Sequence, residues 1–176
     1  SSVDVLEQAW ERAAAAGSAA LPGLRATLAK GTWRRRMAAW KALMELRCKE
    51  AEEALNDALT DIDEDVRLTA LHGLRARGWK PQTPVDHTLA AMAERRVDQL
   101  LKSDGPLDVE TLVEGLFLGG HILRTEIGDV LSHLARHGQW QPNEDELAAW
   151  SATRLEPHRI IDTESGLDTL LQLIDR

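Results

Sequence analysis

The 176-residue chain is poor in several residue types: it has one cysteine, one phenylalanine and no tyrosine. The lone Cys48 cannot form an internal disulfide or a cysteine-rich zinc site. No apolar run approaches the 18 residues of a membrane-spanning helix, and the N-terminus lacks the basic, apolar and small-residue sections of a secretory signal. These absences predict a cytoplasmic protein that has no membrane partner.

The sequence also lacks the short motifs of familiar catalytic sites. Neither glycine-rich phosphate-binding pattern occurs, and no GxSxG marks a nucleophilic serine. Paired carboxylates are present at Asp61, Asp63, Glu64 and Asp65, but a turn between helices already explains them. The sequence therefore indicates no catalytic residue and no cofactor, and it favours a non-enzymatic protein.

Charge is distributed unevenly along the chain, whose net charge is −8. Residues 1–50 hold nine lysine and arginine residues against five acidic ones, whereas residues 51–176 hold twelve against twenty-four. The acidic majority disfavours nucleic acid as the partner, but it leaves room for one local basic patch.

Residues 51–78 show most clearly a pattern to which other segments of the chain can be aligned. The spacing of its apolar residues predicts two helices joined by an acidic turn. Asp63 is the expected N-cap of the second helix, which begins at Glu64, and Gly78 is its expected C-terminal stop. The two apolar stripes are Leu55, Ala58 and Leu59, then Val66, Ala70, Leu71 and Leu74.

The same pattern occurs elsewhere in the chain. Shifted back by 31 residues, it fits residues 20–47 without a gap, with Leu24 on Leu55 and Leu43 on Leu74. Shifted forward by 57 residues, it fits less closely. A period of about 30 residues with helix–turn–helix content is typical of a solenoid. We therefore expect an all-α solenoid with about three recognisable repeats plus extra helices. The repeats cover residues 20–48, 51–78 and 107–138.

The string ALTDIDEDVRLTALHGLRARG in the second repeat resembles the HEAT repeat, in its short bacterial, phycobilin-lyase-type form. Asp61 and Arg67 match the turn aspartate and the second-helix arginine of that family, so the resemblance implies that they link neighbouring repeats. Arg36 matches the arginine in the first repeat, but Lys30 stands at its aspartate position. Arg36 is therefore expected to pair with an acid elsewhere, such as Asp61. The expected structural ladder is Arg36, Asp61, Asp63 and Arg67.

Two segments, residues 79–106 and 139–165, separate the repeats and resemble each other. Each has near its start a tryptophan two residues before a proline, and each predicts a linker followed by an extra helix, the first at residues 85–102. Trp79 and Trp140 are expected to lie buried between repeats in equivalent environments. Partial repeats are expected at both ends of a single domain covering residues 1–176. Two other tryptophans, Trp10 and Trp150, are expected in the core.

The exposed positions of the second helices are expected to form a concave surface that binds another protein. Methionine at such positions adapts to partners of varied shape. The expected surface residues are Arg34, Met37, Lys41 and Met44 in the first repeat, Leu68, His72 and Arg75 in the second, and Thr125, Asp129 and Ser132 in the third.

An alternative function rests on the segment WRRRMAAWK at residues 33–41. Arginine interleaved with tryptophan suits phosphate contacts and base stacking, and HEAT-like DNA glycosylases of the alkylpurine class grip DNA with such residues. The repeat register offers a structural explanation instead. It places Arg35 and Trp40 at core-facing positions and Arg36 in the ladder, which leaves Arg34, Lys41 and Trp33 for a ligand.

Asp129, His133 and His137 follow one another at intervals of four residues. On a helix this spacing suits two histidines sharing one metal ion. The same residues also suit a helix end, where histidines favour the C-terminal dipole and Asp129 pairs with His133. Both explanations stay open, and no metal ligand is assigned. No histidine is followed by glutamate, as in the di-iron hydroxylase related to HEAT proteins, and nothing marks a bilin site.

Overall fold

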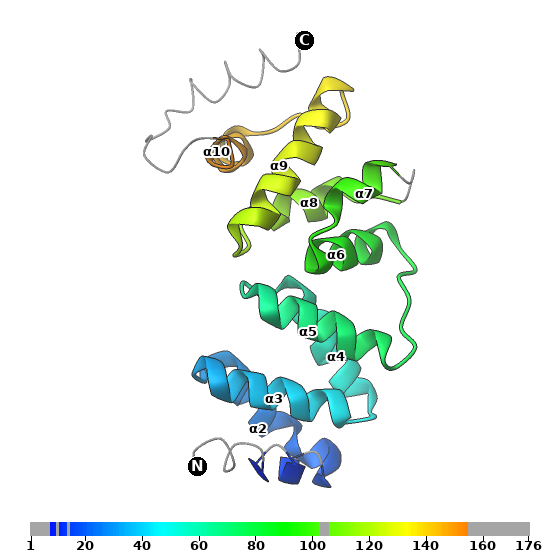
Figure 1. Cartoon of the computed structure of the whole chain (residues 1–176), viewed down its shortest axis with the longest axis vertical. Coiled ribbons are helices and arrows are strands. Elements are labelled where there is room, and N and C mark those ends of the chain that lie inside the picture. Colours follow the sequence, from blue (N-terminus) through cyan, green and yellow to red (C-terminus); the bar gives the residue numbers. More distant parts are fainter. Residues whose placement is uncertain (1–7, 10, 14, 103–105, 155–176) are drawn as a thin grey trace. The chain divides into compact units, whose positions relative to one another are not determined.

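The computed structural model describes residues 8–154, other than residues 10, 14 and 103–105 (Figure 1). Within these residues the secondary structure is helical and includes no strand, so the all-α prediction is confirmed. None of the described helices combines the length and the apolar character needed to cross a bilayer. The predictions for Trp10 and for a partial repeat at residues 166–176 lie outside the described residues.

The chain folds as two compact units, residues 1–80 and residues 81–176, which we call the N-terminal and C-terminal units. The N-terminal unit contains two helical pairs. Helix α2 packs against α3, α4 packs against α5, and α3 lies beside α5 (Figure 1). Their bounds are α2 Leu21–Lys30, α3 Trp33–Glu45, α4 Lys49–Asp57 and α5 Glu64–Arg75, with short 3₁₀ turns η1 at Gly17–Ala20 and η2 at Ala58–Thr60.

The second pair begins and ends where its sequence predicts. Asp63 is the N-cap of α5, and its carboxylate accepts a hydrogen bond from the backbone N–H of Asp65. Gly78 adopts a left-handed φ of 83°, and the N–H of Trp79 donates to the carbonyl of Leu74, which closes the helix end. The predicted apolar stripe is fully buried beneath these ends: Leu55, Leu59, Val66, Ala70, Leu71 and Leu74.

The C-terminal unit contains helices α6 Pro84–Glu94, α7 Val97–Lys102, α8 Val109–Gly115, α9 His121–Arg136 and α10 Glu144–Ala152. The prediction of one helix over residues 85–102 is wrong, because the helix is interrupted between α6 and α7. Arg95 has a left-handed φ of 55°, and the N–H of Arg96 donates to the carbonyl of Ala91. This geometry ends the α-helix at a position where the sequence has neither of the usual signals of a helix end, glycine or proline.

The tryptophans that follow each repeat end differ in burial. Trp140 is 7% exposed and belongs to the core of the C-terminal unit, together with Trp150, which is fully buried as predicted. Trp79 is only partly buried. The prediction of equivalent environments is therefore wrong for Trp79. The shared Trp-x-Pro motif indicates a linker, but it does not determine how deeply the indole ring is buried.

Candidate protein-binding face

Arg36 of α3 and Asp61, at the start of the loop before α5, join the two helical pairs of the N-terminal unit. One terminal nitrogen of Arg36 lies 3.0 and 2.9 Å from the two carboxylate oxygens of Asp61. The Arg36–Asp61 contact expected from the missing aspartate at Lys30 is therefore present. Both side chains are partly exposed, so water weakens their attraction.

Arg67 is 1% exposed, and its buried side chain bonds to the loop before α5. Its guanidinium donates to the backbone carbonyl oxygens of Asp61 at 2.7 Å and of Ile62 at 3.1 Å. These two acceptors are main-chain oxygens of the loop. Burial lowers the pKa of Arg67, and the nearby carboxylates of Glu64, Asp61 and Asp63 act in the opposite direction.

Arg77 forms a second link that the repeat pattern did not predict. Its guanidinium donates to the carbonyl oxygens of Leu43, Met44 and Leu46, at the end of α3, and of Gly73 in α5. The last carbonyls of a helix have no intrahelical partner, so an arginine that reaches them stabilises the helix end. Burial is the largest cause that lowers the pKa of Arg77, and the neighbouring Arg47 adds to it.

Arg36 and Arg77 hold α3 and α5 near their two ends, and the two helices run parallel with their repeat positions in register. Matching positions along them are Arg34 with Asp65, Met37 with Leu68, and Lys41 with His72. We call this surface the α3–α5 face. It consists of Arg34, Met37 and Lys41 on α3 and Asp65, Leu68, His72 and Arg75 on α5.

The α3–α5 face has an apolar centre and a charged border. Met37 and Leu68 are partly buried, and the remaining members are exposed. Sequence reasoning missed Asp65, although the 31-residue shift from Arg34 leads directly to it. It also missed Glu45, which is exposed one turn beyond Lys41. The border therefore carries charges of both signs.

Met44 does not belong to the open part of this face. It is partly buried, and a Cβ added at Gly73 would lie 2.8 Å from its Cγ. Met44 thus packs where α3 and α5 approach each other, and its assignment as a partner-binding residue stays a prediction. Gly73 has no side chain, so α5 can approach α3 this closely.

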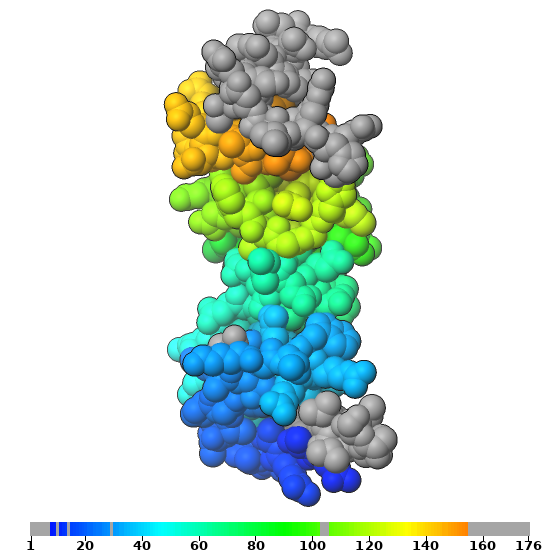
Figure 2. All heavy atoms as spheres, turned by 90° about the vertical axis from the view of Figure 1, so that its left-hand side faces the viewer, coloured from blue at the N-terminus to red at the C-terminus, as the bar shows by residue number. Residues whose placement is uncertain are grey.

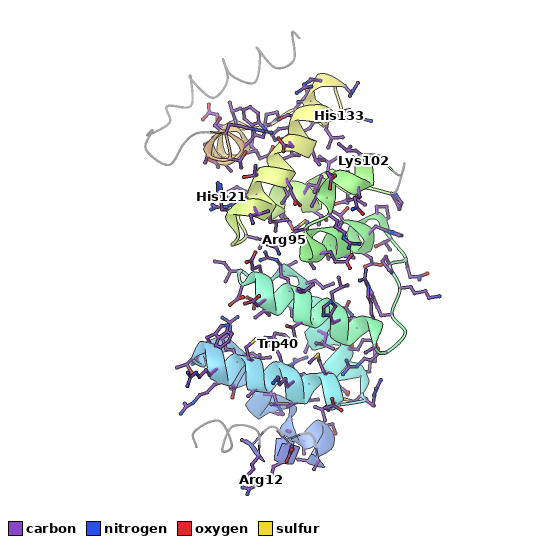
Figure 3. All side chains as sticks on the ribbon, viewed as in Figure 1. Arg12, Trp40, Arg95, Lys102, His121 and His133 are labelled. Atoms are coloured by element: carbon purple, nitrogen blue, oxygen red, sulfur yellow. The ribbon has the colours of Figure 1, made fainter. Side chains whose placement is uncertain are left out.

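The turns before α3 and α5 form one edge of the N-terminal unit, onto which Figure 2 looks. Trp33 and Ile62 are 57% and 67% exposed at this edge. Trp40 is buried as predicted (Figure 3), but Arg35 is exposed, although the register placed it at a core position. A guanidinium can leave the core at the first turn of a helix, where no preceding turn confines it.

The corresponding positions of α9, in the C-terminal unit, are arranged differently, because α10 packs on Gly128 and Ser132. Trp150 of α10 is fully buried and donates through Nε1 to the carbonyl of Gly128 and to Oγ of Ser132, both at 3.1 Å. Ser132 is buried, so its predicted exposure is wrong. Asp129 is exposed but accepts a 2.5 Å hydrogen bond from Arg154. Thr125 is partly buried, and its hydroxyl donates to the carbonyl of His121 in the previous turn.

The three residues considered for a metal do not form a site together. The rings of His133 and His137 lie 4.5 Å apart in a tilted contact at the end of α9, where Figure 3 marks His133. Asp129 is bonded to Arg154 instead. Within the described part of the chain, no group of three or more histidine, cysteine or acidic side chains could hold a metal ion.

Comparisons with known proteins match none of these features to a relative. A scan against protein-family models finds no match, and searches of curated proteins and of solved structures also find none.

Proposed function

We propose that the chain is a non-enzymatic protein-interaction module of the HEAT-like solenoid type, and that the α3–α5 face binds the partner. One observation carries the proposal. Ser132 of α9 is buried beneath Trp150 of α10, whereas the matching Arg75 of α5 is exposed, on a face with partly exposed Met37 and Leu68 at its centre. Apolar side chains within a polar border are typical of protein-binding surfaces.

The charges of the face favour a protein over a uniformly anionic polymer. Arg34 and Lys41 lie on the α3 side, and Asp65 lies beside Arg34 on the α5 side. A partner that matches both signs needs acidic and basic residues around an apolar centre. The packing of α10 on α9 shows within this protein that a helix can occupy such a surface, so we propose an amphipathic helix as the bound element.

Binding kinetics on a partner captured from the source lysate test this assignment. Met37→Ala removes apolar contact at the centre and is expected to raise the dissociation rate about tenfold. Lys41→Glu reverses a border charge and is expected to slow association and to change its salt dependence. Matched controls are Arg25→Ala on α2 and Asn56→Ala on α4, which lie on the first helices. Loss of binding in these controls, with both face variants unchanged, would place the partner on the opposite side.

A second candidate function, nucleic-acid binding, gains support from one observation. Because Arg35 is exposed, the edge presents Trp33, Arg34 and Arg35 together. The exposed Glu64 and Asp65, at the start of the neighbouring α5, oppose a phosphate backbone there. A titration of a single-stranded oligonucleotide at several salt concentrations separates the two functions. Each phosphate contact adds about −0.7 to the logarithmic salt slope, so a slope near zero would exclude this candidate.

A further inference from the structure

The edge of the N-terminal unit that carries the turns before α3 and α5 exposes two large apolar side chains (Figure 2). Trp33 and Ile62 are 57% and 67% exposed there. The ion pair between Arg36 and Asp61 joins their two segments, because Arg36 lies one turn after Trp33 and Asp61 directly precedes Ile62. We call this surface the turn edge. It consists of Trp33, Arg34 and Arg35 on α3, Ile62 before α5, and Glu64 and Asp65 in the first turn of α5.

The main chain at Ile62 is held in place although its side chain is exposed. Buried Arg67 donates to the carbonyl oxygens of Asp61 and Ile62, and the N–H of Asp63 donates to the carboxylate of Asp61 at 2.8 Å. An exposed apolar residue on an ordered main chain loses less conformational entropy when a partner covers it. The turn edge is therefore preorganised for a contact.

The two halves of the turn edge carry charges of opposite sign. Arg34 and Arg35 begin α3, whose first turn holds no acidic residue, whereas Glu64 and Asp65 begin α5. Among the residues that the structure describes, the side chains of Arg34, Arg35 and Asp65 form no hydrogen bond or ion pair. Cations in the first turn of a helix oppose its dipole, so acidic groups brought by a partner would stabilise α3.

We propose that the turn edge binds the turn edge of a second copy of this chain about a two-fold axis. Such a contact requires a self-complementary surface, because each half meets the other half on the second copy. The basic start of α3 in one copy lies against the acidic start of α5 in the other, and Trp33 packs on the other copy's Ile62. The contact shares Arg34 and Asp65 with the α3–α5 face, but it does not depend on the function proposed for that face.

Sedimentation equilibrium of the full chain at increasing concentration tests the proposal. We expect a monomer–dimer equilibrium that Trp33→Ala weakens at least about tenfold, because the substitution removes the largest apolar side chain of the contact. Phe117→Ala removes an aromatic ring of similar exposure from the C-terminal unit and should change the dissociation constant less than about twofold. A chain that stays monomeric at millimolar concentration would overturn the proposal, and equal effects of the two variants would also overturn it.

Charge reversal tests the two-fold arrangement. Arg35→Glu and Asp65→Arg each place like charges opposite one another in both halves of the contact, so each should weaken the dimer at least about tenfold. An equal mixture of the two variants restores opposite charges in both halves and should dimerise at least about tenfold more tightly than either variant alone. Lys41→Glu makes the same reversal later in α3 and should change the dissociation constant less than about twofold.

Two outcomes would assign the turn edge differently. A mixture that stays as weak as the single variants would overturn the two-fold pairing. A monomeric chain that binds a single-stranded oligonucleotide, and loses that binding in Arg35→Glu, would assign the edge to nucleic acid and overturn the second copy as its occupant.

Discussion

The same repeat positions on the second helices have different surroundings in the two units. On α3 and α5 these positions remain open around Met37 and Leu68. On α9, α10 packs on Gly128 and Ser132 through hydrogen bonds from Trp150, while Asp129 stays exposed. One register can therefore produce either an open face or an internal interface, depending on the residues that occupy it.

Side-chain size explains the difference. A Cβ added at Gly128 would lie 2.3 Å from Oγ1 of Thr153, so α10 can approach α9 only where this position is glycine. The 57-residue shift matches Gly128 to Leu71 and Ser132 to Arg75. Leu71 is buried in the core, but Arg75 is exposed and larger than serine, so a helix cannot approach α5 there as closely as α10 approaches α9. The open face thus follows from residue volume, as well as from charge.

The largest test of the comparison removes the side chain that closes the α9 surface. Trp150→Ala leaves a cavity at a fully buried site and is expected to lower the free energy of unfolding by about 3–5 kcal/mol. Trp33→Ala is the matched control, because Trp33 is exposed and its loss should cost about 0.5 kcal/mol or less. Urea denaturation measures both. Equal losses would show that α10 does not close the C-terminal unit as described.

Arg67→Ala tests the buried arginine that supports the open face. It removes two charged hydrogen bonds to the loop carbonyls and is expected to cost about 2–4 kcal/mol. Arg34→Ala, at an exposed position of the same unit, should shift stability by less than about 0.5 kcal/mol. Small and similar shifts in thermal unfolding would mean that the loop before α5 does not depend on Arg67.

A double-mutant cycle on Arg36 and Asp61 measures the coupling between the two helical pairs. Both side chains are partly exposed, so we expect an interaction of about 1 kcal/mol that decreases as salt is added. The cycle uses Arg36→Ala, Asp61→Ala and the double variant in denaturant titrations. A coupling of zero at low salt would leave Arg77 as the main link between α3 and the helix beside it.

The smallest expected effect concerns Glu126 of α9. Burial is the largest cause that raises its pKa above 4.5, and the Asp98 and Asp129 carboxylates add to it. The N–H of Val97 and the charge of Arg95 act in the opposite direction. The folded state therefore holds the proton more tightly, and the stability that protonation provides is lost as pH rises through the raised pKa.

Glu126→Gln keeps the neutral form at every pH. We expect a small increase in stability over the unaltered chain above the raised pKa, and no increase well below 4.5, where both forms are uncharged. Thermal unfolding across this pH range measures it, with Glu144→Gln as the exposed control. An increase of the same size at every pH would rule out titration of Glu126 as its cause.

Local features of the sequence predicted local structure well. Asp63 caps α5 and Gly78 ends it because both residues act within one turn of the chain. The Arg36–Asp61 contact also followed, since a missing aspartate at one repeat leaves an arginine that another repeat can satisfy. The helix ends needed only local sequence signals, whereas the Arg36–Asp61 contact also used the resemblance to the HEAT repeat.

Long-range packing escaped the sequence reasoning. Gly128, Ser132 and Trp150 are each visible in the chain, but nothing in their spacing shows that α10 folds onto α9. The register placed Arg35 in the core, whereas its position at the first turn of α3 lets the charge reach water.

The reach of Arg77 makes the cooperative unit longer than the sequence repeat. The carbonyl groups at the end of α3 depend on a side chain that lies beyond the end of α5, more than 30 residues later. The first helical pair therefore cannot keep its closing turn intact when the second pair unfolds. In nearest-neighbour terms, much of the stability of this end lies in the coupling between pairs, so the two pairs should melt together. The sequence repeats every 31 residues, but the cooperative unfolding unit at this end of the chain should be about twice that length.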